Sequence, residues 1–195
     1  MTLSFYRRNL PHWQPYGSAI FVTWRLYGSF PRGFAEHLRK WNGDPRKQFL
    51  NAERVLDAAS SGPVWLKDPE VARCAERAIQ CGAELSHYEL QAYVVMPNHV
   101  HALLEPLVPL HKLMSGIKGV SAHDANARVG RTGLPFWQDE SFDHWIRDPG
   151  QFARTKTYIE NNPVKAQLCS KPEDWPWSSA HKVAQRLFAV RGSRS

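Results

Sequence analysis

Cysteine is scarce in this chain of 195 residues, and the three that it has do not form a recognisable framework. Cys74, Cys81 and Cys169 contain no CxxC pair, which argues against a disulfide scaffold and against a cysteine-based zinc site. Long apolar runs are also missing, since no stretch approaches the ~18 residues that a membrane helix needs. The first residues lack the apolar core of a signal peptide. These absences predict a soluble protein of the cytoplasm.

The composition is that of a folded domain with a basic surplus. Hydrophobic residues make up 43% of the chain and aromatic residues 12%, which argues against disorder. The formal net charge is +7, with +6 carried by residues 1–54 and +5 by residues 151–195. Positive charge gathered in the two terminal segments fits a polyanion partner, most often a nucleic acid. The alternative is that this charge only keeps the protein in solution.

We expect three parts along the chain. Residues 1–17 form a basic and aromatic arm, residues 18–181 form the domain, and residues 182–195 form a basic tail. In the arm, Arg7 and Arg8 lie near Trp13, a mixture that can grip phosphates and stack on bases. The alternative is a strap whose aromatic side chains pack on the domain.

Periodicity, caps and turn residues give the order of the elements. Strands are expected at 19–26, 88–96 and 99–105 and at the end of 136–147, and helices at 34–60 (interrupted near Gly43 and Pro45), 69–82, 109–129 and from 149 to about 162. This order contains the β-α-β-β-α-β pattern of a ferredoxin-like, split βαβ domain. The fold class is therefore α+β, an antiparallel sheet with helices on one face and the other face free to meet a ligand.

His99 and His101 form the first candidate site. Side chains alternate along a strand, so both imidazoles point to the same face while Val100 points away. Two imidazoles so placed can ligate one divalent ion. The alternative is an ordinary polar strand surface.

Tyr158 and Asn162 form the second candidate site, four residues apart on one face of a helix. A phenol has a pKa near ~10 and is a poor nucleophile unless a metal polarises the phosphate that it attacks. The Asn162 amide oxygen suits a hard ion as a third ligand. Alternatively, Asn162 and Pro163 cap a short helix over 163–168, and Tyr158 is an ordinary tyrosine of an amphipathic helix.

Five stretches carry a family resemblance: YRRNLPHW near the start, YVVMPNHVHALLEP at 93–106, FWQDESFDHWIRD at 136–148, YIENNPVKAQL at 158–168 and WPWSSA at 175–180. Through them the chain resembles the REP-associated tyrosine transposases. These are single-tyrosine, His-hydrophobic-His (HUH) transposases of the insertion-sequence-200 type. The one departure is Gln167, where the family usually has glycine, and it lies outside the chemistry.

The resemblance implies a fold of the HUH-endonuclease type and a set of roles. His99 and His101 correspond to the paired metal ligands, Tyr158 to the nucleophile and Asn162 to the third ligand of Mg²⁺ or Mn²⁺. The implied activity is cleavage and rejoining of single-stranded DNA at REP-type hairpins through a 5′-phosphotyrosine intermediate. The implied protein is a monomer or homodimer of the cytoplasm, associated with the nucleoid.

Contacts to the DNA strand are expected from basic and aromatic side chains. The candidates are Arg7, Arg8, Arg131, Lys118 and Arg147 for phosphates and Trp13 and Trp137 for unpaired bases. Their alternatives are surface charge for the cations and core packing for Trp137, while the roles of Glu105 and His144 stay open. Two other functions compete with the lead: a non-catalytic module that binds structured single strands, and a metal-dependent nuclease that uses water.

Overall fold

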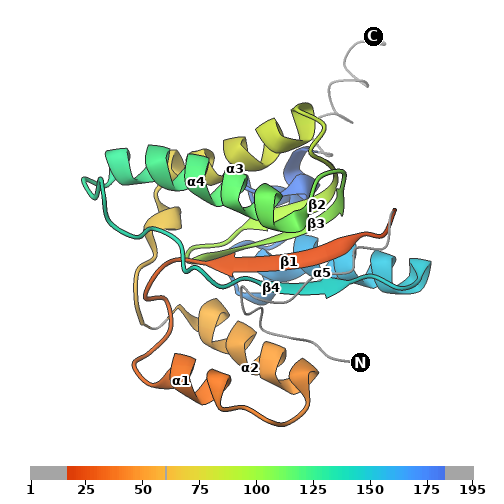
Figure 1. Ribbon diagram of the computed structural model, residues 1–195, viewed down its shortest axis with the longest axis horizontal. Coiled ribbons are helices and arrows are strands. Elements are labelled where there is room, and N and C mark those ends of the chain that lie inside the picture. The colour runs from red at the N-terminus through yellow and green to blue at the C-terminus, as the bar shows by residue number, and fades with distance from the viewer. Residues whose placement is uncertain (1–16, 60, 183–195) are drawn as a thin grey trace.

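The computed structural model describes residues 17–59 and 61–182, which fold around a four-stranded antiparallel sheet (Figure 1). The strands lie in the order β2-β3-β1-β4. Their bounds are β1 Ile20–Arg25, β2 Tyr88–Val95, β3 His99–Pro106 and β4 Phe142–Trp145. β1 pairs with β3 and β4, and β2 pairs with β3. This is the split βαβ order that the sequence predicts, and the expected fold class is confirmed.

One face of the sheet is covered by α3 (Pro69–Glu84) and α4 (Leu110–Arg128), as Figure 1 shows. The start of α3 is where the sequence places it, because the Asp68 side chain accepts a hydrogen bond from the Glu70 backbone N–H at 2.8 Å. Every second residue of β1 points into this face, and Ile20, Val22 and Trp24 are almost completely buried there. The result is the larger apolar core of the molecule.

Helices also cover the second face of the sheet, whereas the sequence analysis predicts helices on one face only. α2 (Pro45–Ala58) and α5 (Pro149–Lys165) pack here, and α1 (Phe34–Arg39) lies beside α2 (Figure 1). Phe49 of α2 stacks on Phe142 of β4 with ring centroids 4.2 Å apart. The intervening residues of the strands are largely apolar too, so this face needs a cover. The expectation that this face is free to meet a ligand is therefore wrong, because helices cover it.

The helix expected over 34–60 is interrupted near Gly43 and Pro45, as predicted, whereas the alternative of a short helix over 163–168 is wrong. Pro163 lies inside α5, and the backbone N–H of Ala166 donates to the carbonyl of Asn162 at 2.9 Å, as in a continuing helix. Asn162 therefore does not cap a new helix, and its completely buried side chain contacts His101 of the sheet.

The segment that follows α5 lies along the free side of β2. It contains a short 3-10 helix at Pro172–Asp174, and Ser178 then forms an isolated bridge with Val94. A second short 3-10 helix, Trp65–Lys67, precedes α3. The Val95 backbone N–H donates to the carbonyl of Trp177 at 2.8 Å. The tryptophan-rich stretch is therefore an edge cover for the sheet. Within the described part of the chain, no helix combines the length and apolarity needed to cross a membrane.

Candidate metal centre and tyrosine site

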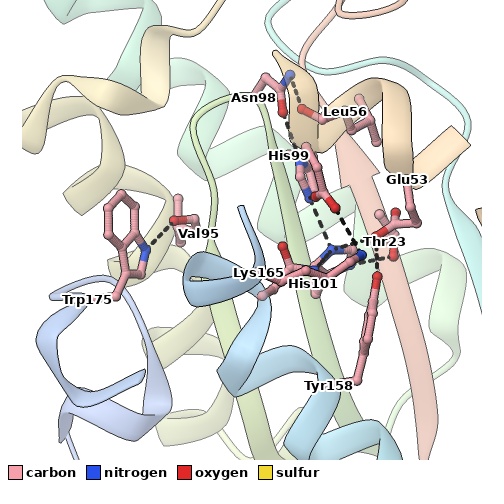
Figure 2. A network of polar contacts seen from close by, with 12 residues as sticks. Thr23, Glu53, Leu56, Val95, Asn98, His99, His101, Tyr158, Lys165 and Trp175 are labelled. Carbon is pink, nitrogen blue, oxygen red and sulfur yellow. Dashed lines mark hydrogen bonds and ion pairs between the residues drawn. The ribbon is translucent and has the colours of Figure 1, made fainter. Parts of the chain in front are cut away.

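The two histidines of β3 converge on one point. Both His99 and His101 are fully buried, and their Nε2 atoms lie 3.0 Å apart (Figure 2). They share a face because they are two residues apart on the strand, which is the period of the pleat. Two imidazole nitrogens so close together can ligate one shared cation.

Each histidine is held by a hydrogen bond at its other ring nitrogen. The His101 Nδ1 atom lies 2.8 Å from the Thr23 hydroxyl, and β1 and β3 pair in a register that puts these two residues opposite each other. The His99 Nδ1 atom lies 2.7 Å from Oδ1 of Asn98. The ring of Phe21 stacks on His101 with centroids 5.5 Å apart. Both Nε2 atoms are thereby fixed toward the shared point.

Glu53 of α2 completes the group, and the sequence reasoning missed it. Its carboxylate Oε2 lies 3.1 Å from Nε2 of His101. The ligand atoms of Glu53, His99 and His101 all lie within 4.8 Å of one another, and all three side chains are buried. The available signal was Glu53 and Asp57 one turn apart on a helix that the sequence does predict. Nothing local says that this helix packs over β3.

Tyr158 and Asn162 approach the same point from α5. The Tyr158 hydroxyl donates a hydrogen bond to the Glu53 carboxylate. The Asn162 side-chain nitrogen lies 3.3 Å from Nε2 of His101. The two residues are four apart on the helix, so one helix face delivers both, as the sequence predicts. The structure thus brings together all four residues predicted at this site: His99, His101, Tyr158 and Asn162.

Two buried oxygen atoms at this point have no hydrogen-bond partner among the described residues. They are Oδ1 of Asn162 and Oδ1 of Asp57, and the latter lies 3.9 Å from Nε2 of His99. The other Asp57 oxygen is 3.1 Å from the Lys165 ammonium. Buried acceptors are rarely left unsatisfied. Two oxygen acceptors beside two imidazoles and a carboxylate are a donor set that fits a divalent cation.

The charges at the site favour a cation. Burial alone raises the pKa of Glu53, but the neighbouring His101 and His99 and the Tyr158 hydrogen bond lower it to about 2, so this carboxyl group is ionised. Burial, together with nearby His101, lowers the pKa of His99 to about 3, so the ring is neutral. Burial and the Glu53 charge raise the pKa of the Tyr158 phenol. A neutral imidazole and an ionised carboxylate are the protonation states in which these side chains ligate a metal. The Tyr158 phenol keeps its proton in these surroundings.

A cavity of about 30 Å³ lies between α2, which contributes Glu53 to its lining, and the end of β1 and the start of β4. Arg25 lines it, with its guanidinium 3.8 Å from the centroid of the Phe30 ring. Burial lowers the pKa of Arg25 to about 10, with Glu140 acting in the opposite direction. This cation was not among those singled out in the sequence, yet it lies beside the site.

Of the seven predicted DNA contacts, Arg7, Arg8 and Trp13 lie outside the described residues. The Lys118 ammonium donates to the carbonyls of Gln138 and Asp139, at 3.0 and 3.1 Å. The guanidinium of Arg131 lies 4.4 Å from the centroid of the Trp65 ring, and Arg147 is exposed just before α5.

Trp137 is only 6% exposed, and its indole N–H donates to the Ser121 hydroxyl at 2.9 Å. An indole so enclosed cannot stack on an unpaired base, so the structure favours the packing alternative for Trp137. The Glu105 carboxylate accepts from the Gln91 amide at 2.9 Å, and His144 lies 2.6 Å from the Gln151 amide. Neither Glu105 nor His144 belongs to the group around Glu53.

Comparison with known proteins places this arrangement in a family. The model of the family described as "Transposase IS200 like" matches residues 64–162, about half of the chain. The chain belongs to the IS200-like transposase family. The matched region contains His99, His101, Tyr158 and Asn162, whereas Glu53 and Asp57 lie before it.

Two curated relatives are REP-associated tyrosine transposases. The one from Escherichia coli (strain K12) is 30% identical over 108 residues, which is 53% of this chain and 61% of that protein. A putative one from Haemophilus influenzae is 28% identical, over 49% of this chain and 60% of that protein. The matched part of the chain therefore spans about three fifths of these relatives.

A solved REP-associated tyrosine transposase bound to a REP hairpin has a similar fold. Its TM-score is 0.58 at 22% identity, and the match covers 94% of this chain and 86% of that one. At this level of identity the likeness supports the fold, and the HUH transposase architecture expected from the sequence agrees with it.

Proposed function

We propose that this IS200-like transposase is a metal-dependent strand transferase that cleaves and rejoins single-stranded DNA at REP-type hairpins, with Tyr158 as the nucleophile. The observation that carries the proposal is the convergence of a phenol, two imidazoles and a carboxylate on one buried point. The Tyr158 hydroxyl donates to Glu53, and the same Glu53 oxygen lies 3.1 Å from His101. The curated relatives have REP-associated names, and the solved transposase of similar fold is bound to a REP hairpin, which supports such a hairpin as the proposed substrate.

His99, His101 and Glu53 are the proposed holders of a divalent ion, Mg²⁺ or Mn²⁺. Asn162 adds an amide oxygen after a change of rotamer, because its nitrogen rather than its free oxygen now faces His101. Glu53 is an addition to the three ligands that the family resemblance implied, His99, His101 and Asn162. When bound, the ion supplies polarisation of the scissile phosphate and neutralises charge as the phosphate is attacked.

In the proposed reaction, the Tyr158 oxygen forms a bond to the scissile phosphorus, and the bond from phosphorus to the 3′ oxygen breaks. The leaving 3′ oxygen takes up one proton, which balances the proton lost by the phenol, and the strand leaves with a 3′-hydroxyl. Glu53 holds the phenol in place beforehand through its hydrogen bond. A second 3′-hydroxyl reverses the reaction and rejoins two strands, without an external energy source.

A single chain can hold all of these groups. The rings of Tyr158 and His101 lie in one chain with centroids 5.7 Å apart. This supports cleavage within one subunit, and hence a monomer as a competent unit, although a homodimer is compatible with the same contacts.

The test uses labelled hairpin oligonucleotides, incubated with the protein and Mn²⁺ and separated on a denaturing gel. We expect a slow, protease-sensitive band that disappears with a chelator and in Tyr158→Phe. Tyr27→Phe is the matched control, because Tyr27 is 49% exposed, and it should keep the band. Cleavage by Tyr158→Phe at the wild-type rate would establish a hydrolytic nuclease instead. Hairpin binding without any cleaved product would establish a binding module.

A further inference from the structure

Asn98 lies in the turn between β2 and β3 and is completely buried. Its side chain makes two hydrogen bonds, which Figure 2 shows. The amide nitrogen donates to the backbone carbonyl of Leu56 at 3.0 Å, and the amide oxygen lies 2.7 Å from Nδ1 of His99. Its backbone carbonyl accepts from the Leu26 N–H at 2.8 Å, so the residue is held from three sides.

The first consequence concerns the proton on His99. Because the Asn98 nitrogen is used on a carbonyl, only its oxygen faces His99, and an amide oxygen can only accept. Nδ1 of His99 must therefore carry the proton, which leaves the lone pair of Nε2 directed at His101 and Asp57. This is the tautomer that ligates a metal through Nε2.

The second consequence concerns α2. Leu56 lies in the last turn of α2, where backbone carbonyls lack the usual partner four residues on within the helix. Its carbonyl accepts from the Ala59 backbone N–H at 3.0 Å and also from the Asn98 amide, which ties the end of α2 to the turn between β2 and β3. The same helix carries Glu53 one turn earlier and Asp57 one residue later. A single side chain thus bonds both to a histidine of β3 and to the helix that brings the carboxylates.

His101 is held differently. Its Nδ1 partner is the Thr23 hydroxyl, which can donate or accept by rotation. Thr23 therefore allows either tautomer of His101, whereas Asn98 allows one tautomer of His99. The two histidines of the pair are consequently not equivalent before an ion arrives.

We propose that Asn98 is a positioning residue which fixes His99 in the Nδ1-protonated tautomer and docks the carboxylate-bearing helix α2 against it, so that both halves of the ligand set are pre-organised. The proposal rests on the metal-binding function proposed above. It assigns to Asn98 a role that acts through His99 and Glu53, without contact to the substrate.

The test separates the two bonds with two variants. Asn98→Ala removes both, whereas Asn98→Asp keeps an acceptor for His99 and loses the donor to Leu56. Asn126→Ala is the control, because Asn126 is also a buried amide that donates to a carbonyl, that of Leu134 at 2.8 Å, but in α4 and away from the histidines. All three are compared with the wild type as full-length protein.

Three measurements are made: the His99 tautomer by NMR of isotope-labelled histidine in metal-free protein, hydrogen exchange across residues 45–58, and Mn²⁺ affinity by titration. We expect Asn98→Ala to mix the tautomers, to speed exchange in α2 and to weaken Mn²⁺ binding by about 10–100-fold. Asn98→Asp should keep the tautomer and speed the exchange, and Asn126→Ala should leave the tautomer and the affinity unchanged.

The wild type alone can overturn the proposal, because protonation of His99 at Nε2 in metal-free protein contradicts it even where a variant does not fold. An Mn²⁺ affinity of Asn98→Ala within twofold of the wild type also overturns it. A wild type that binds no Mn²⁺ is a different outcome, since it defeats the proposed metal function while the tautomer is read independently.

Discussion

The two faces of the sheet are made from the same strands but differ in the polarity of the side chains that they bury. On the α3 and α4 side, β3 contributes Val100, Ala102 and Leu104, all of them fully buried and apolar. On the α2 and α5 side, the alternating residues of the same strand include His99 and His101, equally buried but polar. One face is a packed core. The other encloses polar groups, and two of their atoms, Oδ1 of Asn162 and Oδ1 of Asp57, have no hydrogen-bond partner among the described residues.

This difference in polarity separates the residues that stabilise the fold from those that we propose as the metal ligands. Apolar burial contributes roughly 25 cal/mol per Å² of surface, whereas buried polar groups stabilise little and are costly when unpaired. The unpaired Oδ1 atoms of Asn162 and Asp57 lie on the second face, where they add nothing to the stability of the metal-free fold. We therefore expect substitutions on the core face to lower mainly stability and substitutions on the second face to lower mainly activity.

The largest expected effect is on the site face. In Glu53→Gln the side chain keeps its shape and can still bond to Tyr158, but the anion that faces His101 is gone. We expect cleavage of a hairpin oligonucleotide to fall by more than about 100-fold, beyond what is typical for residues outside the ligand set. The free energy of unfolding of the metal-free protein should also fall, because the folded protein favours the ionised Glu53 carboxylate beside His101 and glutamine does not replace that charge. Unchanged cleavage would remove Glu53 from the ligand set.

The opposite substitution is on the core face. Leu104→Ala leaves a cavity beneath α3 and α4, since Leu104 is fully buried among their side chains. We expect a loss of about 2–5 kcal/mol in the free energy of unfolding, measured by urea denaturation. The Mn²⁺ affinity of the folded fraction should stay at the wild-type value. A parallel loss of affinity would mean that the two faces are coupled.

A pH series sharpens the comparison through His99. Its pKa falls from 6.5 to about 3 on folding, so the stability from the neutral ring is complete above the unfolded value and is lost as pH falls toward 3. We expect the wild type to lose up to about 1.4 kcal/mol per pH unit from this group on acidification below ~6.5. His99→Gln should show a shallower decline in urea unfolding experiments. Equal slopes for the two proteins would contradict the buried, neutral state of His99.

The smallest effect is expected at the exposed rim of the site. Lys165 pairs with Asp57 at 3.1 Å, but its side chain is 52% exposed. Such pairs contribute about 0–1 kcal/mol, so Lys165→Met should change the free energy of unfolding by less than ~1 kcal/mol in denaturant titrations. A change above ~2 kcal/mol would show that Asp57 depends on this partner.

Several features of the fold follow from local sequence. The alternation of β3 puts both histidines on one face, and Asp148, like Asp68, caps its helix through a backbone N–H, that of Gln151 at 2.7 Å. The spacing of Tyr158 and Asn162 makes them neighbours on α5. Each of these depends on residues within a few positions of one another, where periodicity and capping act.

Other features depend on contacts across long stretches of chain. The hydrogen bond from Tyr158 to Glu53 joins residues 105 positions apart, and the bond from Asn98 to Leu56 joins residues 42 apart. The sequence pattern predicts α2 as a helix but gives no direction in which it packs. In the same way, the sequence leaves two interpretations of Trp137, a residue that stacks on bases or a residue of the core. Only its burial beside Ser121 in the structure favours the core.

The sequence by itself determined the elements, the pairing of the histidines and the helix face that holds Tyr158, because these follow from the geometry of one strand or one helix. Only the tertiary structure decided that α2 covers the second face and brings Glu53 to His101, 3.1 Å away. The physical reason is that packing depends on the shape and polarity of surfaces assembled from distant segments. A site built between such surfaces has no local signature in the chain.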